Sequence, residues 1–206
     1  MEIAVVVFEG ITALDAIGPY EVLAMMPGAS VRFCAATPGP VRTHNGFLGL
    51  VADAGLGDVG QPDIVLVPGG PGTGAAAKDD DLLDWLRRVH ETTTWTTSVC
   101  TGSLILGAAG LLRGRRATTH WWSMDDLAAT GAEAVRERVV VDGKLMTGAG
   151  VSAGIDLALR LAAVECGDLV AQRIQLILEY DPQPPFDSGS PAKAPAEVMA
   201  TFGGRR

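Results

Sequence analysis

Short apolar runs alternate along the chain with longer segments whose apolar residues recur at helical spacing. The runs at residues 3–8, 31–35, 63–67 and 95–99 are rich in aliphatic or β-branched residues and are bounded by Gly, Pro or Asp. Such runs are typical of buried strands in a parallel sheet, with helices as the connections between them. The alternation predicts an α/β fold, a three-layer sandwich in which helices cover both faces of a mostly parallel central sheet.

The connecting segments predict the helices in more detail. Residues 14–19 are expected to form a loop, with Pro19 at the first position of a helix that ends before Pro27-Gly28. Apolar spacing predicts a surface helix from about residue 79 and a long helix over about residues 151–166. A further helix is expected at about 169–180.

Turn residues mark two hairpins and an irregular segment. A hairpin is expected through residues 47–51, and Asp142-Gly143 predicts a type I′ turn between runs at 139–141 and 144–147. From about residue 181 the chain is rich in Pro and is not expected to form regular structure. The composition suits one domain over residues 1–206 with this irregular tail.

Composition and charge narrow the class of protein. With 206 residues, of which 48% are hydrophobic, the chain can bury a sizeable core, and its amino-terminal apolar run is too short for a signal peptide or membrane span. Three widely spaced cysteines favour neither a disulfide framework nor a metal cluster, which implies a reducing cytoplasm and no metal cofactor. A net charge of −8 argues against nucleic-acid binding.

The strongest chemical signal is the cysteine that follows the fourth apolar run. Cys100 comes directly after Ser98-Val99 and is followed by small residues and a helical pattern. A sharp strand-to-helix turn needs small neighbours and exposes its central residue at the carboxyl edge of the sheet, as in a nucleophile elbow. The amino terminus of the helix is expected to lower the pKa of the Cys100 thiol.

A nucleophilic cysteine needs an acid–base partner and a place for negative charge. His120, at the end of a short strand, is one candidate partner, and Asp15, in the first connection, is the other. An Asp15 carboxyl facing the thiolate would have a raised pKa and could donate a proton. The Gly69-Gly70 turn and the N–H of Thr101 are candidate donors to an anion. These residues predict a cysteine-dependent hydrolase or hydratase.

Several motifs together carry a resemblance to a known superfamily. The chain contains Leu14-Asp15-x-x-Gly18-Pro19, Pro68-Gly69-Gly70-x-Gly72, Val99-Cys100-Thr101-Gly102, Thr118-Thr119-His120-Trp121 and a closing Asp181-Pro182-x-Pro184-Pro185 segment. It resembles the flavodoxin-like, class I glutamine amidotransferase-like superfamily of the Parkinson-associated deglycase and the PfpI intracellular protease, and within it the isonitrile hydratases. The tail and the surroundings of Asp15 are the more specific signals.

The resemblance implies hydration of an isonitrile, R–N≡C, by water to an N-substituted formamide, without a cofactor. It implies that Cys100 attacks the terminal carbon to form a thioimidate, that Asp15 supplies the proton and that Thr101 orients Asp15 or water. It also implies a homodimer and places Gly70, Gly72 and His120 at the substrate. Thr101 stands where protease-like members have histidine, which argues against peptidase activity.

Two other functions fit the same residues. A glyoxalase or deglycase acting on reactive aldehydes would use the same cysteine through a thiohemiacetal. A ligand or redox sensor would use the domain without turnover, since an exposed thiol of low pKa oxidises readily. The chain is expected to end without the DNA-binding helices that follow this domain in AraC-type regulators.

Overall fold

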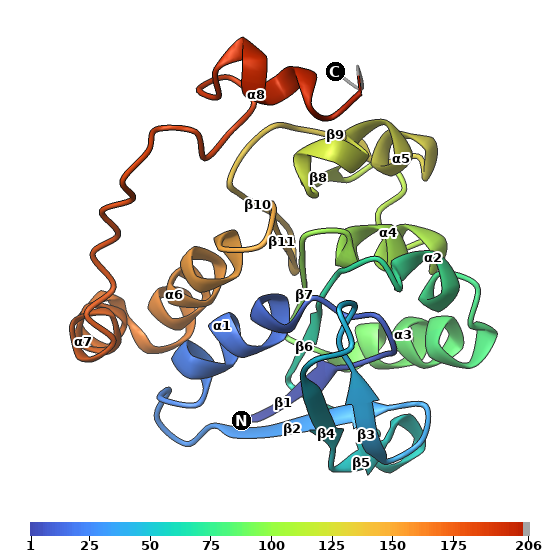
Figure 1. The fold of residues 1–206 in the computed structure, drawn as a ribbon. Helices are drawn as coiled ribbons and strands as arrows, with labels where there is room; N and C mark the ends of the chain where they lie inside the picture. Colours follow the sequence, from blue (N-terminus) through green and yellow to red (C-terminus); the bar gives the residue numbers. More distant parts are fainter. Residues whose placement is uncertain (204–206) are drawn as a thin grey trace.

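A seven-stranded sheet forms the centre of the protein in the computed structural model, which describes residues 1–203 (Figure 1). The last three residues of the predicted 1–206 domain lie outside the described residues. The strand order is β10-β11-β7-β6-β1-β2-β5, and every neighbouring pair is parallel except β10 and β11. The strands are β1 (Glu2–Val6), β2 (Ser30–Ala35), β5 (Ala54–Gly55), β6 (Ile64–Val67), β7 (Trp95–Val99), β10 (Val139–Asp142) and β11 (Leu145–Gly148). The predicted α/β fold is confirmed.

Helices cover both faces of this sheet (Figure 1). One face carries α1, α6 and α7, and the other carries α2, α3 and α4, with α5 packed against α4. The helices are α1 (Ala13–Leu23), α2 (Thr73–Ala76), α3 (Asp80–Thr92), α4 (Gly102–Ala108), α5 (Met124–Ala129), α6 (Ala153–Cys166), α7 (Asp168–Ile177) and α8 (Ala196–Ala200), with short 3₁₀ turns η1 (Leu56–Asp58) and η2 (Trp121–Ser123).

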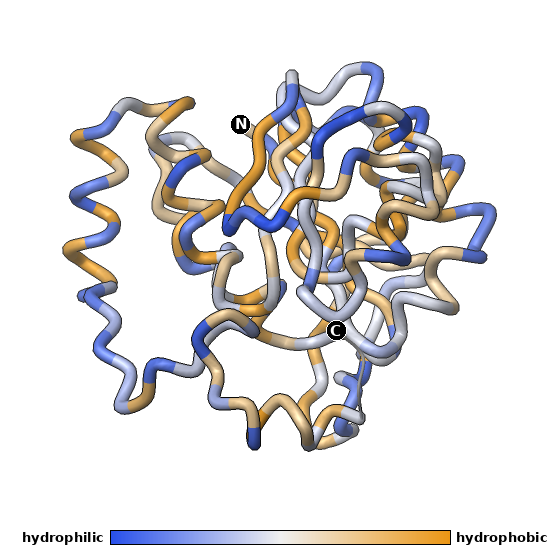
Figure 2. Tube along the Cα trace, turned by 90° about the horizontal axis from the view of Figure 1, so that it is seen from above, coloured by the Kyte–Doolittle hydropathy of each residue, from blue (hydrophilic) through white to orange (hydrophobic). Residues whose placement is uncertain are grey.

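Alternate side chains of the central strands enter different cores. In β1, Ile3 packs with α1 and α6, while Ala4 and Val6 pack with α3 and α4. All three are buried, because a strand between two helical layers has no face in water. In Figure 2 the helix α7, at the left edge, alternates between hydrophilic and hydrophobic positions.

The first helix begins earlier than expected. Helix α1 starts at Ala13, so Asp15 lies in its first turn rather than in a loop, and Pro19 lies inside the helix rather than at its first position. A proline there removes one helical hydrogen bond, that of its own nitrogen to the Asp15 carbonyl. Packing outweighs this loss, because the Pro19 ring lies directly against Gly154 of α6, where an added Cβ would be 2.8 Å from the ring.

Both predicted hairpins form, with differences in detail. β3 (Gly39–Arg42) and β4 (Gly49–Ala52) pair outside the main sheet, so the first hairpin starts earlier than residue 47. In the second, Asp142 pairs with Leu145, which leaves Gly143 and Lys144 as the loop. Only Gly143 has a positive φ, of 61°, which fits a type II′ turn and not the predicted type I′ turn.

The remaining segments lie at the carboxyl side of the sheet. β8 (Arg116–Ala117) pairs with β9 (Glu133–Ala134) and leads into η2. From residue 181 the chain runs without regular structure until α8, which lies above β9 and β10 (Figure 1). Within residues 1–203 no helix combines the length and the apolar character needed to cross a membrane.

The start of α4 tests how tightly the sheet and its connections pack. A Cβ added to Gly102 would lie 2.0 Å from the carbonyl oxygen of Val67, whereas one added to Gly74, in α2, would meet nothing within 4 Å. Because backbone must move to relieve the first contact, Gly102→Ala is expected to lower the free energy of unfolding by about 3 kcal/mol. Urea denaturation measures this, with Gly74→Ala as the matched control; equal stability of the two variants would contradict the packing.

Candidate functional site

Cys100 lies at the turn between β7 and α4 with a left-handed backbone, φ 57°. Its N–H donates to the carbonyls of Gly148 and Ala149, at 3.0 and 3.1 Å. Its carbonyl accepts from the hydroxyls of Thr119, at 2.9 Å, and Ser103, at 3.2 Å. A non-glycine residue is uncommon in this region, and the four hydrogen bonds hold it there. The expected strand–turn–helix geometry is therefore present.

Asp15 reaches the same point from the first turn of α1. It is fully buried, and its Oδ2 accepts from the backbone N–H of Gly69 at 2.9 Å. Within the described residues Oδ1 has no hydrogen-bond partner of ordinary geometry, and the thiol of Cys100 is the polar side chain that interacts with this carboxyl. The structure thus brings Cys100 and Asp15 together.

Burial governs the protonation of both groups. It raises the pKa of Asp15 to about 7, while the hydrogen bond from Gly69 and the adjacent Cys100 thiol lower it. Burial also raises the pKa of the Cys100 thiol to about 12, and the charge of Asp15 acts in the same direction. Near pH 8 the pair therefore holds one proton, on the Cys100 sulfur, beside an ionised Asp15.

The pKa of Asp15 is raised, in agreement with the sequence analysis. The pKa of Cys100 is also raised, whereas the sequence predicts a lowered value. The backbone N–H and the hydroxyl of Thr101 both lower the pKa of the thiol, as a helix amino terminus should. Burial and the Asp15 carboxylate outweigh them. The thiol is therefore a protonated group beside a base rather than a free thiolate.

Thr101 contacts the glycine loop as well as the sulfur. Its Oγ1 accepts from the N–H of Gly70 at 3.0 Å and lies 2.8 Å from the hydroxyl of Thr73. The described structure contains no hydrogen bond between Thr101 and Asp15, so the expected orienting contact is not formed directly. Instead, Gly69 links them, since its N–H binds Asp15 and an added Cβ would lie 2.5 Å from the Thr101 nitrogen.

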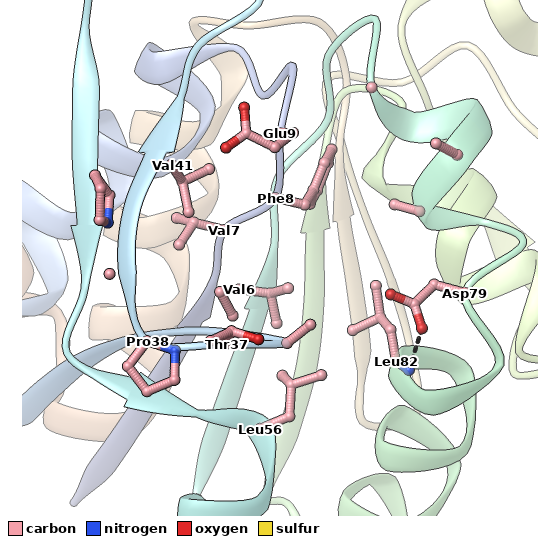
Figure 3. Close-up of a pocket in the computed structure, with 17 residues that line it drawn as sticks. Val6, Val7, Phe8, Glu9, Thr37, Pro38, Val41, Leu56, Asp79 and Leu82 are labelled. Atoms are coloured by element: carbon pink, nitrogen blue, oxygen red, sulfur yellow. Dashed lines mark hydrogen bonds between the residues drawn. The ribbon is translucent and has the colours of Figure 1, made fainter.

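The two predicted substrate-binding glycines occupy different surroundings. The N–H of Gly70 is directed at Thr101, and that of Gly72 donates to the Gly10 carbonyl at 3.0 Å. Gly72 lines a cavity of about 500 Å³ between the end of β1, the start of β3 and α2 (Figure 3). Cys100, Asp15 and Thr101 are not among the residues that line this cavity.

His120 does not pair with Cys100 in the described structure. Its Nδ1 accepts from the N–H of Trp122 at 3.3 Å, and its ring lies on Gly150, where an added Cβ would be 2.4 Å from Cδ2. Burial lowers the pKa of the imidazole, so it is neutral at pH 7. Of the two candidate partners, Asp15 is the one in contact with the thiol.

A second cavity, of about 590 Å³, adjoins the Cys100 turn. Leu14 lines it beside Asp15, and Thr119 and Ala149 line it where they bind the Cys100 backbone. Its other walls come from residues 118–121, Met124 and residues 136–138, 150–152 and 189–192, with His120 among them. Cys100, Asp15 and Thr101 do not line this cavity either, but Leu14, Thr119 and Ala149 are their direct neighbours, and this makes it the candidate substrate site.

Sequence reasoning missed the residues that hold the turn. Thr119 and Ala149 lie 19 and 49 positions from Cys100, and neither stands in a spacing that would indicate a contact. The other two cysteines are apart from the site: burial raises the pKa of Cys34 to about 12, and Cys166 ends α6. No group of His, Cys, Asp or Glu among residues 1–203 is arranged to hold a metal ion.

Comparisons with known proteins agree with this geometry. The chain is 47% identical to an isonitrile hydratase of Pseudomonas putida over 199 residues, which cover 97% of this chain and 87% of that protein. A solved ThiJ/PfpI family protein from Pseudomonas syringae superposes with a TM-score of 0.95 at 41% identity, covering 98% of this chain and 84% of that one.

A more distant structure shares the fold. Drosophila melanogaster DJ-1β superposes with a TM-score of 0.79 at 23% identity and covers 86% of this chain and 97% of that one. The family model of DJ-1/PfpI matches residues 1–164, which include Asp15, Cys100 and His120. The chain therefore belongs to the DJ-1/PfpI family.

Proposed function

We propose that the protein hydrates isonitriles to N-substituted formamides through a covalent thioimidate on Cys100. The observation that carries the proposal is the buried pair of Cys100 and Asp15, in which a base contacts the thiol and the pKa of the carboxyl is about 7. The 47% identity to the Pseudomonas putida isonitrile hydratase supports it. Isonitrile hydration needs a nucleophile and a group that moves a proton to carbon, and this pair supplies both.

In the first step the Cys100 sulfur attacks the terminal carbon of R–N≡C. Asp15 takes the thiol proton as the S–C bond forms and then delivers it to the same carbon, so that the triple bond becomes the N=C bond of a thioimidate. The N–H and hydroxyl of Thr101 lower the pKa of the thiol and so favour the negative charge that develops on sulfur.

In the second step water resolves the thioimidate. Asp15, anionic again, takes a proton from water while the oxygen adds to carbon, and that proton passes to the nitrogen. The C–S bond then breaks, the formamide R–NH–CHO leaves, and the hydroxyl proton returns to Cys100 through Asp15. The sum is one isonitrile and one water giving one formamide.

Substitution of the two central residues tests the assignment. Cys100→Ala is expected to abolish formation of the formamide from 4-nitrophenyl isocyanide, and Asp15→Asn to lower kcat by 10²–10⁴-fold, the range for loss of a general acid or base. Circular dichroism checks that both variants fold. Cys166→Ser, at a cysteine remote from the pair, should retain activity within about twofold. Turnover of methylglyoxal without any isonitrile hydration would instead favour the aldehyde enzyme.

The pH dependence follows from the pKa of Asp15. Below about pH 7 the carboxyl is protonated and cannot accept the thiol proton, so kcat/KM is expected to rise through pH 7 and then level off. Steady-state rates between pH 5.5 and 9 measure the profile, and the inflection should be absent in Asp15→Asn. If kcat/KM of the wild type did not change with pH, the protonation of Asp15 would not control the rate.

We also propose a homodimer. The tip and edge of the β3–β4 hairpin expose Phe47, Leu48 and Val51, with Phe47 89% exposed, and apolar groups of this kind gather at contacts between subunits. Light scattering should give twice the mass of the chain, and Phe47→Asp is expected to shift the mass toward the monomer. A monomeric wild type would refute this part of the proposal.

A further inference from the structure

The candidate substrate cavity has one wall that belongs to neither the sheet nor its helices. Residues 189–192 of the irregular tail line it, together with residues 118–121, Met124 and residues 149–152. The tail reaches this position from α7, on the far side of α6, and continues into α8 (Figure 1). No step of the proposed chemistry uses these residues.

One aromatic cluster fastens the tail. Phe202, just after α8, packs edge-on against Trp121 and Trp122, with ring centroids 5.5 and 5.3 Å apart, and the two tryptophan rings stack at 5.3 Å. Trp121 also lines the cavity. Edge-to-face pairs of this kind add to the burial of the rings, so Phe202 holds the tail against Trp121 and Trp122.

The tail has little else to hold it. Throughout residues 182–203 the hydrogen bonds of the described structure join residues of the tail to one another, as in Lys193 to Asp187 and the Lys193 N–H to Ser190. A second phenylalanine of the tail, Phe186, is 77% exposed and forms none of the aromatic pairs found in the described residues. Among the aromatic pairs and hydrogen bonds of the described residues, those of Phe202 join residues 182–203 to the rest of the protein.

The position of the cavity relative to Cys100 suits the substituent of an isonitrile. Val151 packs in the same hydrophobic cluster as Cys100 and also lines the cavity, and Leu14 lines it next to Asp15. An isonitrile is linear, so a molecule whose terminal carbon meets the sulfur extends its substituent straight away from it. A cavity of about 590 Å³ is far larger than the reacting group alone requires.

We propose that residues 189–203 complete a subsite for an aromatic or bulky apolar group on the isonitrile nitrogen, with Phe202 as the residue that positions this wall. The inference rests on the proposed function. The apolar residues of the lining, Leu14, Trp121, Met124, Val151 and Pro191, would contact such a group. Arg136, Glu137 and Arg138 also line the cavity, and Glu137 and Arg138 are paired with Arg116 and Asp156. The tail thus determines which isonitriles bind well, while Cys100 and Asp15 carry out the reaction.

Two substrates of different size separate this role from a general effect on folding. Phe202→Ala is expected to raise KM for phenyl isocyanide about tenfold, because two aromatic pairs are lost, and to change KM for methyl isocyanide less than twofold. kcat should stay within twofold for both. Phe186→Ala removes a phenylalanine from the same tail without touching the cluster, and it should behave as the wild type.

A variant that narrows the subsite provides a second test of the proposal. Ala192→Trp places a large side chain in the tail wall and is expected to lower kcat/KM at least tenfold for phenyl isocyanide while sparing methyl isocyanide. Equal changes for the two substrates, or no change for either in both variants, would overturn the subsite.

A different result would show that the proposed function itself is wrong. If the wild type hydrates neither isonitrile, that function is wrong, and calorimetric binding of N-phenylformamide and N-methylformamide decides the subsite independently. The phenyl compound should bind more tightly, and Phe202→Ala should remove that preference. Equal binding of the two formamides to the wild type would exclude an aromatic subsite formed by the tail.

Discussion

The left-handed backbone of Cys100 is the constraint on which the site depends. At φ 57° a residue with a side chain is strained by about 1–3 kcal/mol, and this conformation persists only if its surroundings hold it. Two carbonyls from the end of β11 and two hydroxyls, of Thr119 and Ser103, do so. The turn therefore exists only after β7, β11 and the segment after β8 have come together. The backbone conformation of Cys100 therefore depends on contacts from several elements at the carboxyl edge of the sheet and not only on its neighbours in the sequence.

Glycines around this turn allow three loops to occupy a space that side chains would fill. The first connection after β1, the loop after β6 and the start of α4 meet so closely that a Cβ on Gly69, Gly72 or Gly102 would lie within 2.5 Å of a backbone atom. In open α/β sheets the position between β1 and β6, where the strand order reverses, is the usual place for a ligand crevice. Here the residues after β1 and β6 line the first cavity, and the second cavity lies beside the Cys100 turn at the end of β7.

Much of the fold and the centre of the site could be predicted from the chain. The strands were visible because buried parallel strands form short apolar runs, and Cys100 stood out because one such run ends at it. The start of α1 was missed for the opposite reason: Asp15, Gly18 and Pro19 are all buried, so the helix lacks the polar face that makes a helical period visible. The pKa of Cys100 was misjudged because the sequence shows a helix start but not the burial that outweighs it. The contact of Phe202 with two tryptophans some 80 positions away leaves no local pattern at all.

The burial of Asp15 also links the chemistry to the stability of the fold. Its pKa is about 7 in the folded protein and 3.8 in its ordinary state, so between these values the folded chain holds a proton that the unfolded chain releases. Stability is therefore greatest, as far as this group is concerned, below pH 3.8, and it declines as the pH rises to 7, by on the order of 4 kcal/mol. The anionic carboxyl that accepts the thiol proton is the form that the fold tolerates least. Evolution of a more stable variant would thus tend to remove the charge on which turnover depends.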